Sequence, residues 1–210
     1  MNPYHNNRPN LLRTQVYNYL RKNIDNGHIS PGEYVKFNEI CDALEISRTP
    51  VRDALLHLQA EGFVSLLPQH GIQINHVSQT ELRNIYEALG GLEAKMLKSV
   101  FHRIGEKQIE KMKKINEEMN SFRSKNEFHR YYKKNLAFHN VFINLSKNDL
   151  MKYHISILKQ RIFEFTKRVW GRNWQTLNYD EHKTLIDLIE KGDASQASTY
   201  WDDVHWSFNW

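Results

Sequence analysis

The sequence has little cysteine and no long apolar run. Its single cysteine, Cys41, excludes an internal disulfide framework and fits a reducing compartment, so we expect a cytoplasmic protein. No stretch approaches the roughly 20 apolar residues that a membrane-spanning helix needs, and no membrane partner is expected. The segment Met1–Asn10 is polar and lacks the apolar run of a secretory signal.

The first part of the chain also lacks an excess of positive charge. Residues 1–77 contain seven Lys and Arg and seven Asp and Glu, although the whole chain carries a net charge of +5. A DNA-binding role therefore has to rest on where individual cations are placed, not on the overall charge. With 25% charged and 40% hydrophobic residues, the composition is that of an ordinary globular protein of one or two domains.

What the sequence does contain is a stretch, residues 45–55, that is typical of the turn and second helix of a helix-turn-helix. Ser47 is a good N-cap residue, because its hydroxyl can accept hydrogen bonds from the first turn. Arg48 and Arg52 are four residues apart and share one helix face, with Thr49 beside them. Two guanidinium groups and a hydroxyl at the start of a helix suit the DNA major groove. The plainer alternative is an amphipathic helix with solvated arginines.

The residues around this stretch predict a winged helix-turn-helix. Apolar residues at helical spacing predict helices over about residues 12–24 and 38–44. The recognition helix is expected to end at Gly62, and two β-prone runs flank a Pro/Gly turn at residues 68–71, which predicts a hairpin. Three helices followed by a hairpin would make residues 1–77 a DNA-binding domain.

From Ser78 onward the pattern is entirely helical. Residues 78–81 have the form of a capping box, and similar patterns begin at Ser124 and Asn178. Six helices are predicted, over about residues 79–102, 106–120, 124–146, 149–170, 178–191 and 193–208. The expected fold is therefore mainly α, with an N-terminal winged helix-turn-helix followed by an all-α six-helix bundle over residues 78–210.

These residues together resemble a known family. The string Ser47–Arg52, with Ile29–Gly32 before it and Glu61–Val64 after it, is similar to the DNA-binding domain of GntR-type bacterial transcription regulators. The helical region resembles the ligand-sensing FCD domain of the FadR-like branch. The matching pieces are Tyr86-Glu87, Leu92-Glu93, Phe138-His139, Ser146-Lys147-Asn148, Glu181-His182, Gly192-Asp193 and Ala197. The resemblance implies a homodimer on a short pseudo-palindromic DNA operator, with a small metabolite that changes DNA affinity.

The resemblance also implies which residues contact DNA. Arg48, Thr49 and Arg52 are the main expected contacts. Supporting contacts are implied for Ser47, Asn38 and Gly71.

Many members of this branch hold a divalent metal with an aspartate and a histidine four residues apart on one helix and with two later histidines. The corresponding residues here are Asn135, His139, His182 and His205. Asn135 brings no negative charge, and the family register for the last ligand falls on Val204, one helical step of about 100° away from His205. His154 is a possible substitute ligand. Two alternatives stay open: a site for zinc, nickel or manganese, or a metal-free pocket whose histidines bind the effector directly.

The expected effector site also departs from the family. Where relatives often carry a ligand-binding arginine this chain has Leu89, followed by a Gly90-Gly91 pair that could kink the helix. Four residues are expected to serve the effector: Asn148, His154, Arg161 and Arg168. The effector is expected to be an organic acid or a larger aromatic metabolite.

The expected function is a sequence-specific DNA-binding transcription regulator, a repressor that an effector releases. One alternative is a metal-dependent enzyme, in which three histidines and an open position activate water. Against it, no paired carboxylates, Ser/His/Asp set or phosphate-binding glycine loop accompanies the histidines. Another alternative makes the winged helix a protein-interaction module, against which the Arg/Thr/Arg face argues.

Overall fold

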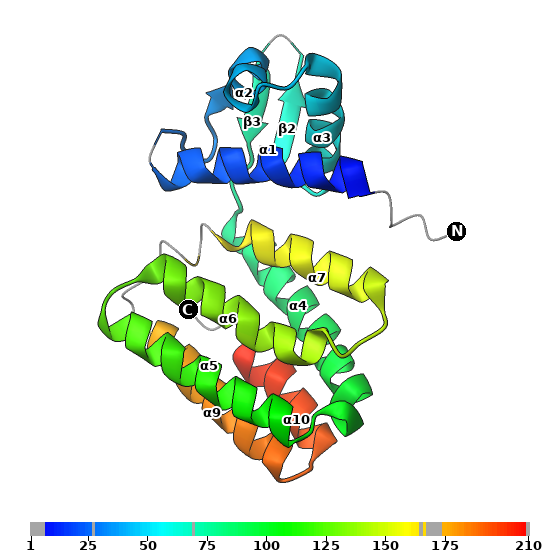
Figure 1. The fold of residues 1–210 in the computed structure, drawn as a ribbon, viewed down its shortest axis with the longest axis vertical. Helices are drawn as coiled ribbons and strands as arrows, with labels where there is room; N and C mark the ends of the chain where they lie inside the picture. The colour runs from blue at the N-terminus through cyan, green and yellow to red at the C-terminus, as the bar shows by residue number, and fades with distance from the viewer. Residues whose placement is uncertain (1–6, 27, 69, 164–165, 167–173, 209–210) are drawn as a thin grey trace. The chain divides into compact units, whose positions relative to one another are not determined.

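The structure is a computed structural model that describes residues 7–26, 28–68, 70–163, 166 and 174–208 (Figure 1). The chain divides into two compact units, Met1–His76 and Val77–Trp210. Each unit has its own hydrophobic core. Among the described residues, no helix is both long and apolar enough to cross a lipid bilayer.

The first unit packs three helices against a small sheet. Its elements are α1 (Asn7–Asp25), β1 (Tyr34–Val35), α2 (Phe37–Leu44), α3 (Arg48–Ala60), β2 (Val64–Leu67) and β3 (Gly71–Ile74). The strands are antiparallel in the order β1-β3-β2, and Ile72 and Ile74 face the core with Val64. The predicted helices and hairpin are confirmed. Strand β1, which pairs with the hairpin, was not predicted, because two residues are too few to give a periodic pattern.

The turn between α2 and α3 sets the start of the recognition helix. Glu45 ends α2 in a left-handed conformation (φ 55°), and its N–H bonds back into α2. Ser47 has the extended backbone of an N-cap, but its side chain makes no capping hydrogen bond. The predicted capping role of the Ser47 hydroxyl is therefore wrong, and the side chain is exposed instead. Pro50 lies within the first turn, where its missing N–H costs nothing.

The second unit is helical throughout its described part. Its elements are α4 (Gln79–Val100), the 3₁₀ turn η2 (Phe101–Arg103), α5 (Glu106–Ser124), α6 (Phe128–Ile143), α7 (Asp149–Arg161), α9 (Trp174–Glu190), α10 (Ala194–Tyr200) and the π-helical turn η3 (Trp201–His205). Figure 1 shows α5 and α6 side by side, with α9 behind α5. The fold class, an N-terminal winged helix-turn-helix followed by an all-helical region, is confirmed.

Of the three helix starts that capping patterns predicted in this unit, one is confirmed and two are wrong. Ser78 caps α4 as predicted, since its hydroxyl accepts from the backbone N–H of Glu81. The pattern at Ser124 does not start a helix, because α5 runs on to that residue and Asn126 then takes a left-handed conformation (φ 56°). The pattern at Asn178 lies inside α9, where burial of the side chain replaces capping.

Helix α4 is continuous through the Gly90-Gly91 pair. Gly90 is buried where α4 passes close to η3: a Cβ there would fall on Oδ1 of Asp202 and lie 3.1 Å from Cβ of Trp206. Gly91 is exposed, and a Cβ there would meet nothing within 4 Å. The first glycine is therefore explained by the close approach of two helices and not by a kink.

Candidate functional site

The first candidate site is the exposed face of the recognition helix in the first unit. Arg48, Thr49 and Arg52 are all exposed at the N-terminal end of α3. They line a groove whose other side is formed by the hairpin, including Pro68 and Gly71. The predicted DNA-contacting residues thus lie together on one open surface, with two cations beside the helix N-terminus, which itself favours phosphate.

Asn38 is not an independent surface group in this site. Its side-chain oxygen accepts hydrogen bonds from Nε and Nη2 of Arg48, at 3.2 and 2.6 Å. Because both bonds come from one guanidinium group, Asn38 fixes the direction in which Arg48 points away from α3. The resemblance implied that Asn38 contacts DNA. The structure adds a second role, in which Asn38 positions Arg48, and residue spacing alone did not reveal it.

Gly71 has a structural reason to be glycine. Its backbone has φ +94°, and a Cβ would lie 2.8 Å from the carbonyl oxygen of Val35. Any side chain would therefore separate β1 from the first residue of β3, at the turn end of the hairpin. This requirement explains the residue without any contact to DNA.

The second candidate site is a cluster of three buried histidines from three helical segments. His139 lies on α6, His182 on α9 and His205 at the end of η3. Each offers a ring nitrogen, and these nitrogens all lie within 4.8 Å of one another. Asn135, one turn before His139 on α6, is buried as well. The structure therefore brings together the histidines of the predicted metal set.

One nitrogen of each ring is already bound by an oxygen acceptor. The pairs are His139–Glu93 (2.7 Å), His205–Glu181 (2.9 Å) and His182–Asn116 (3.3 Å), each measured from Nδ1 to the acceptor oxygen. An acceptor beside Nδ1 favours the imidazole tautomer in which Nδ1 carries the hydrogen. The lone pair at Nε2 is then left for a ligand, as in histidines that bind metals.

Other atoms of this cluster lack partners within the described part of the chain. Nε2 of His139, Nε2 of His182 and Oδ1 of Asn135 are buried and make no hydrogen bond. Unpartnered buried polar atoms are rare in folded proteins, so a bound ion, ligand or water is expected at these atoms. Imidazole nitrogens with one amide oxygen form a neutral donor set that zinc or nickel accepts. The residues therefore fit a divalent metal, without the negative charge that an aspartate would add.

The one-residue offset of His205 is compensated by η3. This turn is π-helical, and the N–H of Trp206 bonds five residues back to the carbonyl of Trp201 at 3.3 Å. A π-helical turn accommodates one extra residue in a helix and rotates the residues beyond it about the helix axis. As a result Val204, at the family register, is 40% exposed, whereas His205 is 7% exposed and stacks on Trp201 with ring centroids 3.8 Å apart.

A buried ion pair that sequence analysis missed lies beside the histidines. Oε1 of Glu93 lies 2.5 Å from Nζ of Lys159, and both side chains are buried. Oε2 of Glu93 is 2.7 Å from Nδ1 of His139 and accepts from Nε1 of Trp201 and Trp206, at 3.0 and 3.3 Å. Glu93 thus connects α4 with α6, α7 and the C-terminal segment. Its place on the apolar stripe of α4 was the signal that could have revealed it.

The charges of this cluster follow from burial and contact. Burial alone would raise the pKa of Glu93, but Lys159 and His139 lower it below the usual range, so Glu93 is ionised. Burial lowers the pKa of Lys159, and Glu93 opposes that shift. Burial, followed by the charge of Lys159, lowers the pKa of His139 to about 3. Burial also lowers the pKa of His182 well below its usual value. Both rings are therefore neutral at pH 7, the form that binds metal.

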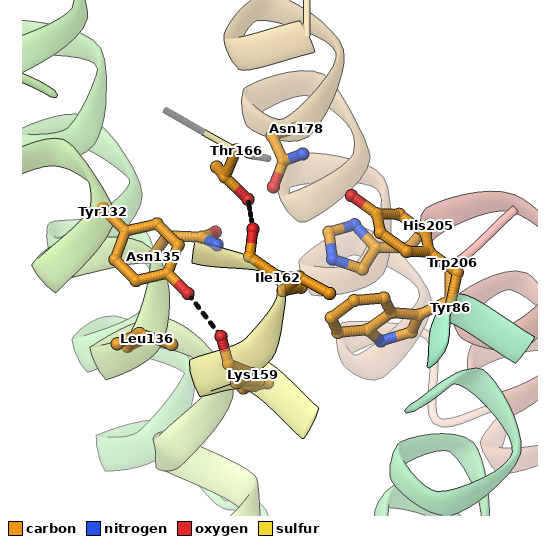
Figure 2. A pocket seen from close by; sticks show the side chains of 10 residues that line it. All are labelled: Tyr86, Tyr132, Asn135, Leu136, Lys159, Ile162, Thr166, Asn178, His205 and Trp206. Carbon is orange, nitrogen blue, oxygen red and sulfur yellow. Dashed lines mark hydrogen bonds between the residues drawn. The ribbon is translucent and has the colours of Figure 1, made fainter. Parts of the chain in front are cut away.

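A small cavity adjoins His205 of the histidine cluster (Figure 2). Its free space is about 20 Å³, roughly enough for one water molecule. Lys159, Asn135 and His205 line it together with the rings of Tyr86 and Trp206. Asn178 also faces it, and the side-chain oxygen of Asn178 is buried with no hydrogen-bond partner. Pockets that hold small molecules usually measure about 300–1,000 Å³, so an effector at this place has to displace some of the side chains that line the cavity.

The residues expected to bind the effector do not gather at this cavity. Asn148 caps α7 by accepting from the N–H of Met151 at 3.0 Å, and His154 is exposed on the same helix. Arg161 pairs with Glu81. None of these three lines the cavity. Arg168 lies outside the described residues. The cation that does line the cavity is Lys159, which sequence analysis did not single out.

A winged helix-turn-helix with two exposed arginines, joined in one chain to a helical unit with an internal cavity, defines a DNA-binding regulator with a sensory domain. Two family models match: the gntR family of bacterial regulatory proteins over residues 12–74, and the FCD domain over residues 84–204. The chain belongs to the GntR family of transcription regulators and carries an FCD domain. The predicted function as a transcription regulator, and not an enzyme, is confirmed.

Similar proteins with curated descriptions are regulators. The chain is 24% identical to the HTH-type transcriptional regulator LutR of Bacillus subtilis (strain 168), over 83% of this chain and 89% of LutR. It is 22% identical to the HTH-type transcriptional repressor GlaR of Escherichia coli (strain K12), over 87% of each chain. It is 23% identical to YdhC of Bacillus subtilis (strain 168), over 95% of this chain and 90% of YdhC.

Two solved structures support the fold. Escherichia coli McbR/YncC has a TM-score of 0.74 at 18% identity, covering 90% of this chain and 91% of that chain. A transcriptional regulator GntR from Rhodococcus sp. RHA1 has a TM-score of 0.69 at 16% identity, covering 90% of both chains. Regulators of this family bind DNA operators, and they bind small-molecule effectors through the FCD domain, typically as dimers.

Proposed function

We propose that this regulator is a repressor that binds a pseudo-palindromic operator as a homodimer and leaves it when a small molecule enters the helical unit. Residues 1–77 would form the DNA-binding domain, and residues 78–210 the effector-binding and dimerisation domain. The observation that carries the proposal is the exposed Arg48/Thr49/Arg52 face beside the hairpin, in the same chain as a lined cavity. The similarity to GlaR, a transcriptional repressor, supports the direction of regulation.

In this proposal Arg48 and Arg52 read base edges in the major groove, and Thr49 and Ser47 bind phosphate at the start of α3. Asn38 holds Arg48 in direction. Gly71 lets the hairpin close against β1, so that the wing can approach the DNA backbone.

A duplex selected by the protein from a random-sequence pool tests the DNA contacts. Arg48→Ala and Arg52→Ala should each weaken binding by about 1–3 kcal/mol and relax sequence preference at the contacted base pair. Lys22→Ala, which removes a cation from the last turn of α1, is the matched control. Equal affinities for wild type and both arginine variants would remove α3 from the interface.

We also propose that the histidine cluster binds one divalent metal, with zinc or nickel favoured over manganese by the nitrogen-rich donor set. His139, His182 and His205 would each bind through Nε2, and Asn135 through its side-chain oxygen. The metal would supply a positive charge next to the cavity that attracts the effector. The support is the acceptor at every Nδ1, together with the unpartnered atoms of His139, His182 and Asn135.

Elemental mass spectrometry on untagged protein tests the metal proposal. We expect about one metal ion per chain, lost in His139→Ala and retained in His154→Ala, which removes an exposed histidine from α7. Circular dichroism establishes that both variants fold. A metal-free wild type with a folded helical unit would favour the alternative in which the histidines bind the effector directly.

A further inference from the structure

Lys159 is a buried cation with spare hydrogen-bonding capacity. It lies in the last turn of α7, its side chain is 8% exposed, and it lines the cavity. Its ammonium group is 2.5 Å from Oε1 of Glu93, yet Nζ makes no hydrogen bond of good geometry with any residue that the structure describes. An ammonium group has three donors, and one carboxylate oxygen cannot satisfy them all. Lys159 can therefore bind a second anion, and because the cavity has room for about one water molecule, that anion enters only by displacing side chains that line it.

Arg161, two residues later, reaches the opposite end of the same neighbouring helix. It pairs with Glu81 in the first turn of α4. Glu81 also donates its backbone N–H to the capping hydroxyl of Ser78. Glu81 and Glu93 are twelve residues apart on α4, about 18 Å along the axis. The last turn of α7 thus holds α4 at two distant points through two ion pairs.

We propose that the last turn of α7 is a relay, in which Lys159 detects an anionic group of the effector and Arg161 passes the movement to Glu81 at the start of α4. The relay deepens the proposed function and rests on it. An anion in the cavity competes with Glu93 for the ammonium group and draws Lys159 toward it. Since one helical turn moves as a unit, Arg161 is displaced relative to Glu81. Helix α4 directly follows the DNA-binding unit along the chain, so its first turn is the part of the sensory unit that leads to it.

The two ends of the relay make separate predictions. The Lys159 end concerns which ligands bind, because a cation selects an anion over a neutral molecule of the same shape. The Arg161 end concerns what binding does, because Arg161 does not line the cavity. Loss of the Arg161–Glu81 pair should therefore leave ligand affinity intact and abolish its effect on DNA affinity.

The ligand end is tested by thermal shift with succinate and citrate, using succinamide as the neutral counterpart. Wild type should be stabilised by at least one acid and not by succinamide, and Lys159→Met should lose about tenfold or more in apparent affinity. Because Lys159→Met leaves Glu93 buried without its cation, the double variant Glu93→Gln/Lys159→Met provides a folded comparison. Stabilisation of the double variant by the acid at wild-type concentrations would overturn the role of Lys159.

The output end is tested by measuring operator affinity with and without the stabilising acid. In wild type the acid should change the Kd by about 5- to 150-fold, the usual range for coupled sites. Arg161→Gln and Glu81→Gln should reduce that change below about twofold while the thermal shift persists. The charge-swapped double variant Glu81→Arg/Arg161→Glu should restore it. Lys152→Gln, which breaks an exposed ion pair with Asp149 on the same helix, is the control and should keep the full response.

Full coupling in Arg161→Gln, with wild-type operator binding, would overturn the relay and leave the proposed function standing. Wild-type protein that binds its selected duplex but responds to neither acid would overturn both the anionic effector and the relay. Absence of any duplex selected over random DNA would instead overturn the proposed function.

Discussion

The two units of the molecule keep their charged groups in opposite places. In the winged-helix unit, the charged side chains of Arg13 and Glu61 are 10% and 6% exposed and pair with each other at 2.7 Å. The cations proposed to contact DNA, Arg48 and Arg52, are exposed on α3. In the helical unit, Glu93 and Lys159 lie within the core beside three buried histidines. The candidate site of the first unit is therefore on its surface, and that of the second is in its interior.

This difference determines how much each site lowers the free energy of unfolding of its unit. Exposed arginines keep their hydration, so they contribute function at almost no expense in stability. A buried ion pair loses its hydration and is stable only while every partner is present. The helical unit should consequently be sensitive to single changes at its site, whereas the winged-helix unit should tolerate them.

The largest expected effect is the loss of Glu93. Glu93→Gln preserves shape but leaves Lys159 charged and buried, and should cost about 3–5 kcal/mol of unfolding free energy. All five tryptophans lie after residue 77, so tryptophan fluorescence during urea unfolding reports the helical unit alone. The single thiol, Cys41, is buried in the winged-helix core, and its urea-dependent labelling reports the other unit.

Two outcomes would contradict this role of Glu93. One is an unchanged fluorescence midpoint in Glu93→Gln. The other is a double variant, Glu93→Gln/Lys159→Met, that is no more stable than the single one, since removing both charges should recover most of the loss. The Cys41 labelling midpoint serves as the internal control and should not move.

The next largest effect is expected on lowering the pH, which should destabilise the helical unit more than the winged-helix unit. The pKa of His139 in the fold is about 3, and that of His182 is also lowered, so both rings stay neutral where the unfolded chain, with a pKa near 6.5, binds protons. Stability is therefore lost as the pH falls through 6.5 toward the folded value. Between pH 7 and 5.5 the helical unit should lose about 2 kcal/mol in the presence of a chelator, roughly 1 kcal/mol per ring.

The winged-helix unit has no buried histidine among its described residues, so its Cys41 midpoint should change little over the same interval. His139→Gln should flatten the fluorescence-detected pH dependence by about half. A helical unit whose midpoint is the same at pH 7 and 5.5 would mean that the rings are protonated in the fold.

The same contrast explains what the sequence could predict. The Arg48/Thr49/Arg52 face depends only on spacing within one helix, and spacing predicts it in full. The histidines were matched by resemblance, but the position of His205 required a π-helical turn that leaves no periodic signal. Glu93 and Lys159 lie 66 residues apart, and only the packing of α7 on α4 makes them partners. Spacing along one element therefore reveals surface sites better than buried ones.

The adjacent glycines give a smaller and internally controlled test. Gly90→Ala places a methyl group against Asp202 and Trp206 and should cost about 1–3 kcal/mol, because the Asp202 carboxylate must rotate away and Trp206, at the end of η3, must shift slightly. Gly91→Ala meets nothing and should stabilise the helix by about 0.5–1 kcal/mol. Trp206 directly follows His205, so the first variant should bind metal more weakly. Equal midpoints in tryptophan fluorescence for the two variants would refute the close approach of α4 and η3.

The smallest effect is expected from Asn38→Ala, which removes the partner of an exposed cation as Glu93→Gln removes the partner of a buried one. Asn38→Ala removes the oxygen that accepts from Arg48, just as Glu93→Gln removes the partner of Lys159. Arg48 is exposed, so water replaces the lost acceptor, and the Cys41 midpoint should change by less than about 0.5 kcal/mol. Operator affinity should fall by about 0.5–1 kcal/mol, less than in Arg48→Ala, because the guanidinium group remains but is no longer held in direction. A loss as large as that of Arg48→Ala would show instead that Asn38 itself contacts DNA, and the positioning role would then have to be given up.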